Sequence, residues 1–256
     1  MDRSHERRVR LETLLSEQGL AAMTERFPGV VAERPLNTLS LSETGCLMSH
    51  RSLLGGLTDS ENTVILEDDT CFSKDFGIKI KEISSLIDNS TFDIIFLGQT
   101  ILFQDAEMHA KTIKVFLESR RNNKTLFLNA EDCYRFGSFA YVINKKSVSK
   151  INKLIDNLDL KRDAKSIDVL IRQWLRSKKL TGAITLPYLV GVDSNIETTI
   201  NDRSKAFEHR LHCELVNLYI NDNSQVVTGE WLDILNDEPN LQALAVCKIM
   251  YARLTQ

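Results

Sequence analysis

Cysteine is scarce and scattered in this sequence. The five cysteines form no C-x-x-C pair, and their number is odd. These two features argue against a zinc ribbon and against a disulfide framework. They indicate a reducing, cytoplasmic setting for the thiols, which are Cys46, Cys71, Cys133, Cys213 and Cys247.

Long apolar runs and a surplus of positive charge are also absent. No uninterrupted apolar run reaches the roughly 18 residues that a membrane span needs, and the first residues lack the apolar core of a signal peptide. Any membrane contact is therefore expected to be peripheral, at the inner membrane face. The formal net charge of -3 gives no electrostatic reason to expect a nucleic-acid partner.

Glycine and proline are infrequent, with 11 and 4 residues among 256, and no tract rich in either divides the chain. A chain of this length suits one large domain, or one domain with an appendage. Strand-like runs alternate with helical patterns, which predicts an α/β layered fold. The predicted strands are 63–66, 93–97, 125–128, 139–143 and 183–190, and helical spacing of apolar residues predicts helices around 9–15, 76–87, 148–155 and 167–174.

The pattern changes after about residue 202, where it becomes helical and charged. We therefore expect residues 1–202 to form the α/β domain. Residues 203–256 are expected to form a mostly helical extension that packs on this core.

The most informative segment is 63–69, in which a β-branched apolar strand ends in Glu67, Asp68 and Asp69. Two negative charges about 4 Å apart repel by roughly 4 kcal/mol at an effective dielectric constant near 20. A divalent cation would relieve this repulsion, and Mg²⁺ or Mn²⁺ commonly joins carboxylates to substrate phosphates. The segment therefore predicts a metal and nucleotide-diphosphate site; the alternative is a solvated acidic turn.

A second segment, 40–53, has the spacing of a capped helix. Ser40 and Glu43 are placed as in a capping box, so a helix is expected to begin there. It would carry Cys46 and His50 along neighbouring faces. Gly45 weakens such a helix and would permit the close approach of another backbone segment.

Together these segments resemble glycosyltransferase family 25, in which an E-x-G-C-x-x-S-H helix precedes an I-L-E-D-D strand. Residues 43–50 read E-T-G-C-L-M-S-H and residues 65–69 read I-L-E-D-D. Three weaker marks follow in the family's order, at 93–98, 137–143 and 166–169, so the similarity spans about 2–200. Two departures are Ser166, where the family often has proline, and the family's opening strand, which we expect to lie upstream or to be replaced by another segment.

The resemblance implies a GT-A-like, Rossmann-type nucleotide-sugar-binding domain with inverting chemistry. The implied donor is UDP-galactose or UDP-glucose, and the implied acceptor is a lipooligosaccharide or LPS glycan. By family analogy, Glu67 and Asp69 would hold Mn²⁺ or Mg²⁺, with Asp69 the more direct ligand, while Asp68 would lie on the donor side. Asp168 would be the catalytic base; the alternative is an acid that complements the dipole at a helix N-terminus.

Further residues are predicted to contact the donor, and each has a plainer alternative. His50 and Ser49 offer hydrogen bonds to phosphate or ribose, but a histidine on an amphipathic helix is often simply packed. Arginines of the first helix could reach a pyrophosphate or could form only its solvated face. The full predicted set is Glu43, Ser49, His50, Glu67, Asp68, Gly137, Arg3 and Arg7, while Cys46 is expected to be structural rather than nucleophilic.

Three functions fit these residues. The first is the hexosyltransferase just described. The second is a catalytically silent member that binds a nucleotide or a glycan and acts as an interaction protein. The third, a metal-dependent phosphodiesterase or nuclease, is disfavoured because the sequence has no basic bias and no other metal-ligand cluster.

Overall fold

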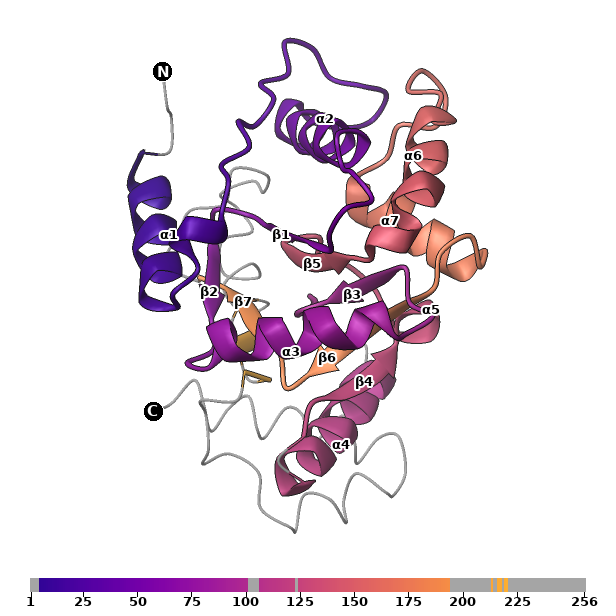
Figure 1. Ribbon diagram of the computed structural model, residues 1–256. Coiled ribbons are helices and arrows are strands. Elements are labelled where there is room, and N and C mark those ends of the chain that lie inside the picture. The colour runs from indigo at the N-terminus through magenta and orange to yellow at the C-terminus, as the bar shows by residue number, and fades with distance from the viewer. Residues whose placement is uncertain are drawn as a thin grey trace.

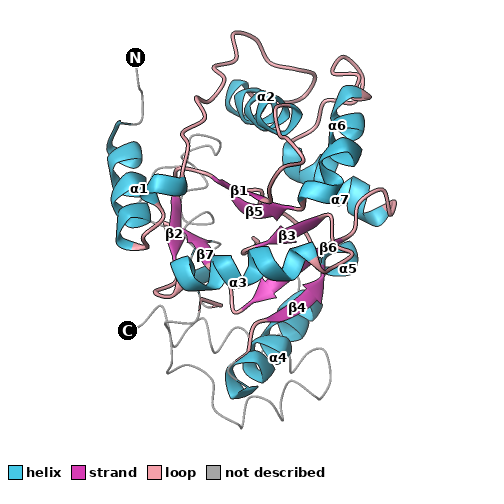
Figure 2. Cartoon of the chain, viewed as in Figure 1, coloured by secondary structure: helices cyan, strands magenta, loops and turns pink. Residues whose placement is uncertain are grey.

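The computed structural model describes residues 5–100, 106–122 and 124–193. Five further positions are described, namely Cys213, Val216, Asn217, Tyr219 and Ile220. Figure 1 shows the arrangement of the helices and strands, and Figure 2 separates them by type. Within the described residues, no helix has the length and apolar character to cross a bilayer.

The centre of the molecule is a five-stranded mixed sheet with the strand order β1-β5-β3-β6-β4. β3 and β6 are parallel, whereas the other neighbouring strands are antiparallel. A mixed sheet with helices packed against it confirms the α/β class. Its strands are β1 (Thr63–Leu66), β3 (Ile94–Phe96), β4 (Leu126–Asn129), β5 (Ala140–Ile143) and β6 (Gly182–Leu186).

A second sheet holds two short antiparallel strands, β2 (Thr70–Phe72) and β7 (Val190–Val192). The prediction of one strand over 183–190 is wrong, because the chain forms β6, leaves the main sheet and then forms β7. Pro187 follows β6 directly and has no N–H to donate to a strand ladder. Only Val190, the last residue of the predicted strand, belongs to β7, where it pairs with Phe72 of β2.

Helices pack on both sides of the main sheet (Figure 1). α2, α6 and α7 gather on one side, and α3 and α4 lie on the other in this view. The helices are α1 (His5–Glu17), α2 (Leu41–Gly55), α3 (Phe76–Asp88), α4 (Ala106–Asn122), α5 (Ala130–Cys133), α6 (Val148–Asp156) and α7 (Ile167–Arg176), with 3-10 turns η1 (Ala21–Met23) and η2 (Lys145–Ser147).

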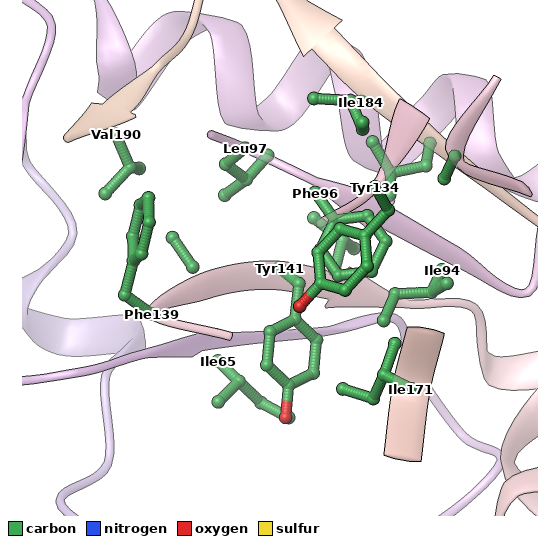
Figure 3. Close-up of a cluster of buried hydrophobic side chains, with 14 of the residues drawn as sticks. Ile65, Ile94, Phe96, Leu97, Tyr134, Phe139, Tyr141, Ile171, Ile184 and Val190 are labelled. Carbon is green, nitrogen blue, oxygen red and sulfur yellow. The ribbon is translucent and has the colours of Figure 1, made fainter. Parts of the chain in front are cut away.

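The predicted apolar stripes are buried. Ile80, Ile83 and Ile87 of α3 are covered, as are Ile151 and Ile155 of α6. Figure 3 shows part of the core, in which aromatic rings from β3, from β5 and from Tyr134, which follows α5, lie among branched aliphatic side chains. Burying one such side chain contributes about 1.5–3 kcal/mol, so these stripes fix how the helices lie on the sheet.

One buried carboxylate ties β3 to its neighbours. Lys150 Nζ lies 2.6 Å from Asp93 Oδ2, Ser147 donates to Oδ1 at 2.6 Å, and the Thr181 N–H donates to Oδ2 at 2.7 Å. Burial alone would raise the pKa of Asp93, but these three partners outweigh it and lower the pKa. The charged carboxylate is therefore part of the folded structure at neutral pH.

Most predicted elements of 1–193 are present, with shifts of a few residues at their ends. The strand β2 and the helices α4 and α5 were not predicted. The predicted helical extension, 203–256, lies outside the described residues except for five positions, and Val216 and Tyr219 among these are buried.

Candidate functional site

The three consecutive acids form the turn that joins β1 to β2. Glu67 follows β1 directly, and its N–H donates to the carbonyl of Phe139 at 2.8 Å, which extends the pairing with β5 by one residue. Thr70 Oγ1 donates to the Glu67 carbonyl at 2.9 Å and closes the turn. The acids are therefore held by both sheets.

The three carboxylates lie in different environments. Asp68 forms an ion pair with Arg7, with Nη1 2.9 Å from Oδ1. Glu67 Oε1 lies 3.1 Å from His50 Nε2. Asp69 is half-buried like the other two, but its Oδ1 atom is buried and has no hydrogen-bond partner among the described residues.

Asp69 is also the carboxylate whose pKa is most affected. Burial and the negative charge of Glu67 together raise the pKa of Asp69 to about 7, although Arg7 acts in the opposite direction. A buried carboxyl oxygen without a donor is costly unless it is neutralised by a proton or a cation. Either a proton or a cation would neutralise this oxygen, so its burial is compatible with the predicted cation site.

Helix α2 contributes the second part of the site and begins as predicted. Ser40 Oγ accepts from the Glu43 N–H at 3.2 Å, and Glu43 Oε2 accepts from the Ser40 N–H at 2.7 Å, so the capping box is confirmed. A Cβ on Gly45 would lie 2.8 Å from the Val30 carbonyl oxygen, which confirms the predicted close backbone approach. Ser49 holds the same segment, because its Oγ accepts from the Val30 N–H at 2.7 Å and donates to the Gly45 carbonyl at 2.7 Å.

His50 is buried and links α2 to the sheet. Its Nδ1 lies 2.8 Å from the Tyr141 hydroxyl, and its Nε2 faces Glu67. A tyrosine O–H that donates to Nδ1 would place the ring proton on Nε2, from where it donates to Glu67. His50 is thus packed in the interior, as the plainer alternative expects, and its hydrogen bonds also link it to Glu67 in the acidic turn.

Asp168 occupies the first turn of α7, as predicted, and organises the loop before β5. Its Oδ1 accepts from the Tyr134 hydroxyl at 2.9 Å, the Gly137 N–H at 2.8 Å and the Ser138 N–H at 2.7 Å. Ser138 Oγ in turn lies 3.4 Å from Glu67 Oε1. Ser138 therefore connects Asp168 to the acidic turn. Tyr134 and Tyr141 also belong to the apolar cluster of Figure 3.

Gly137 has a backbone that other residues rarely adopt. Its φ is +127°, and a Cβ there would lie 2.7 Å from Gln99 Cα and 3.0 Å from the Thr100 nitrogen. Protein backbone fills the space next to this glycine. The turn requirement thus explains the residue, and its contact with a donor stays a prediction.

Helix α1 packs beside the acidic turn through two arginines. Arg7 pairs with Asp68, and Arg10 reaches Asp193 at 2.6 Å and the Thr70 carbonyl at 2.9 Å. Arg7 is therefore close to the predicted metal ligands, as its proposed role requires. Arg3 lies outside the described residues.

Cys46 lies one helical turn before His50 and is half-buried. Burial raises the pKa of this thiol well above its usual range, and Glu67, Asp168, Asp69 and Glu43 raise it further. A cysteine with so little thiolate character is not a nucleophile.

The structure brings most predicted residues into one region around the carboxyl end of β1. It adds Arg10, Tyr134, Ser138 and Tyr141, whose contacts could not be read from spacing. The only sequence signal for Ser138 and Tyr141 was the run 137–143, one of the weaker marks of the resemblance.

Comparison with known proteins identifies the family of the chain. A family model described as glycosyltransferase family 25 (LPS biosynthesis protein) matches residues 3–167. No curated protein matches the chain. The matched region contains α2, the acidic turn and the Gly137 loop, and it ends one residue before Asp168. Because the match covers more than half of the chain, this protein belongs to glycosyltransferase family 25.

Proposed function

We propose that the protein is a metal-dependent, inverting glycosyltransferase with a GT-A-like domain. It moves galactose or glucose from a UDP-sugar to a lipooligosaccharide or LPS glycan. Family membership supports glycosyl transfer in LPS biosynthesis. The inverting chemistry, the UDP-hexose donor and the glycan acceptor are what the family resemblance implies, whereas the metal ligands and the base are argued from the site.

The observation that carries the proposal is the Oδ1 atom of Asp69, a buried carboxyl oxygen near Glu67 that has no donor among the described residues. Oxygen ligands of this kind suit Mn²⁺ or Mg²⁺. The donor set at the end of β1 therefore fits such an ion, with Glu67 and Asp69 as the residues that would hold it. When bound, the ion would neutralise the charge that grows on the departing UDP.

Asp68 and Arg7 have a supporting role. Their ion pair fixes α1 against the turn and leaves the other two carboxylates to the metal. The guanidinium of Arg7 also supplies positive charge where a diphosphate would lie, because guanidinium groups bind phosphate oxygens in bidentate geometry. On α2, His50 faces Glu67, whereas Ser49 bonds the Val30 N–H and Glu43 caps the helix at Ser40.

Asp168 is proposed as the base. All three hydrogen bonds to this carboxylate end on Oδ1, and no donor among the described residues reaches Oδ2. Oδ2 can thus accept the proton of an acceptor hydroxyl as that oxygen attacks the anomeric carbon and the bond to UDP breaks. The bonds to Oδ1 hold the carboxylate in one orientation during this step.

The test is the thermal stability of the purified chain with UDP, UDP-galactose, UDP-glucose and UDP-N-acetylglucosamine, each with and without Mn²⁺. A ligand that binds only the folded state at a hundredfold excess over its dissociation constant adds about 2.7 kcal/mol. We expect a manganese-dependent increase for wild type that Asp69→Asn abolishes. Asp163→Asn is the matched control, because Asp163 is an exposed acid that pairs with the neighbouring Arg162.

Asp69→Asn with undiminished manganese-dependent binding would refute the site. Binding without transfer to any glycan acceptor would instead assign the protein a silent, nucleotide-binding role. The sugar that gives the largest increase identifies the donor.

A further inference from the structure

A second group of potential metal ligands lies beside the proposed donor site. Cys46 Sγ, a ring nitrogen of His50 and a carboxyl oxygen of Glu67 all lie within 4.8 Å of one another. Cys46 and His50 are four residues apart on α2, so they lie on the same face of this helix. Glu67 approaches them from the end of β1.

The spacing of these atoms suits a single ion. In a tetrahedral site, zinc bonds of about 2.0–2.3 Å place two ligand atoms roughly 3.3–3.8 Å apart, so the longest of the present separations, within 4.8 Å, must shorten by about 1 Å. Small side-chain rotations would therefore bring the three ligands onto a common ion. Leu47 and Leu54 anchor α2 in the core with almost no exposure, so the helix itself need not move.

The donor types decide which metal would bind. A thiolate, an imidazole and a carboxylate are all zinc ligands, and three protein ligands with one open position are a recurrent zinc arrangement. Manganese and magnesium prefer oxygen, so the sulfur disfavours them. This donor set differs in kind from the all-carboxylate pair Glu67 and Asp69.

The surroundings of His50 also suit a metal ligand. Its Nδ1 lies 2.8 Å from the Tyr141 hydroxyl, on the opposite side of the ring from Glu67. The hydroxyl can donate to Nδ1 in the metal-free protein and accept from Nδ1–H once Nε2 binds an ion. A second hydrogen bond that orients a ligating histidine in this way typically accompanies zinc sites.

We propose that Cys46, His50 and Glu67 bind one zinc ion. The thiol proton is released to solvent as the zinc–sulfur bond forms, and the ring proton of His50 is carried on Nδ1. A consequence, which rests on the proposed function, is that zinc removes Glu67 from the donor site and so inhibits manganese-dependent donor binding.

Zinc binding is measured on the metal-depleted full chain by titration against a chromophoric zinc indicator, with no nucleotide present. We expect one zinc ion per chain. Cys46→Ser should weaken binding by at least about 100-fold, since the loss of an outer-shell partner alone costs about 10–100-fold. Cys71→Ser is the matched control, because Cys71 is a half-buried thiol on β2 outside the cluster, and it should bind zinc as wild type does.

Cobalt(II) gives an independent test, because thiolate ligation produces a near-ultraviolet charge-transfer band. The band should form in wild type and Cys71→Ser and be absent in Cys46→Ser. If Cys46→Ser fails to fold, Glu67→Gln, which keeps the shape of the side chain, must weaken zinc binding instead. The proposal would be overturned if wild type bound no zinc, or if whichever of these two variants folds bound zinc as tightly as wild type.

The two proposals fail separately. Asp69→Asn should lose manganese-dependent UDP binding and keep zinc binding, because Asp69 is not among the three zinc ligands. Zinc should lower the manganese-dependent stabilisation by UDP in wild type and leave this stabilisation unchanged in Cys46→Ser. An equal decrease in both proteins would contradict the inhibitory role of the zinc site.

Discussion

Replacing Gly137 by alanine should destabilise the protein and displace Asp168. The backbone at this position has a φ of +127°, and the added Cβ would lie 2.7 Å from Gln99 Cα and 3.0 Å from the Thr100 nitrogen. Both neighbouring atoms belong to the backbone. The clash therefore cannot be relieved by a side-chain rotation.

The expected loss follows from two contributions. A non-glycine residue held in a sparsely populated backbone region costs of order 1–3 kcal/mol, and the displacement of the backbone near Gln99 adds to this. We expect a total of about 3 kcal/mol, or a fall of about 6–12 °C in melting temperature, at about 2–4 °C per kcal/mol for a chain of this size.

Chemical denaturation measures the loss, and Gly55→Ala is the matched control. Gly55 ends α2, and a Cβ there would meet nothing within 4 Å. Removing backbone freedom at such a helical position should stabilise the protein, by up to about 1 kcal/mol. The two alanine variants should thus move in opposite directions.

Gly137→Ala should also slow glycosyl transfer, because the N–H groups of Gly137 and Ser138 hold Asp168 Oδ1. Donor binding, measured with UDP and Mn²⁺, should persist in the folded variant. A Gly137→Ala protein that unfolds at the wild-type denaturant concentration would refute the loop conformation and the reasoning built on it.

Three further substitutions test the remaining contacts. Asp168→Asn should keep the fold, because its amide oxygen can still accept the three hydrogen bonds, but should lower kcat by about 10²–10⁴-fold; wild-type turnover would exclude it as the base. Asp93→Asn should cost about 2 kcal/mol at pH 7, since it removes a charged hydrogen bond from Lys150. Folding lowers the pKa of Asp93, so the charged carboxylate contributes to stability above its unfolded pKa near 3.9, and this contribution is lost as pH falls through the folded pKa. The difference in free energy of unfolding between Asp93→Asn and wild type, measured in urea, should therefore shrink below about pH 4. A difference that stays constant with pH would contradict this. Ser49→Ala should cost about 1 kcal/mol and speed hydrogen exchange at the Val30 amide, which loses its acceptor, whereas unchanged exchange would show that the bond does not hold this segment.

The local elements of the described region were largely predictable from sequence. Apolar spacing located α3, α6 and α7 because each buries a single stripe, and the capping box located the start of α2. The strand over 183–190 was mispredicted because apolar runs look alike whether they remain in one sheet or change sheets. β2 was missed because it is short and owes its pairing to β7, a partner distant in the chain.

The site was predictable as a set of residues but not as a set of contacts. Glu67, Asp69, His50 and Asp168 could be identified from sequence, because each lies in a short segment that resembles a segment of the family. Sequence reasoning gave Asp168 two possible roles and could not see that Gly137 and Ser138 share its Oδ1.

By itself, the sequence determined the α/β class, the carboxylates at the end of β1 and the family, because these depend on short-range patterns along the chain. Only the tertiary structure decided that the Oδ1 of Asp69 is buried without a donor among the described residues, that Asp68 pairs with Arg7, and that His50 faces Glu67. Burial and hydrogen bonding depend on which surfaces meet when helices pack on a sheet. Residues 17 and 61 positions apart thus become neighbours, and that proximity gives three adjacent acids three different electrostatic environments.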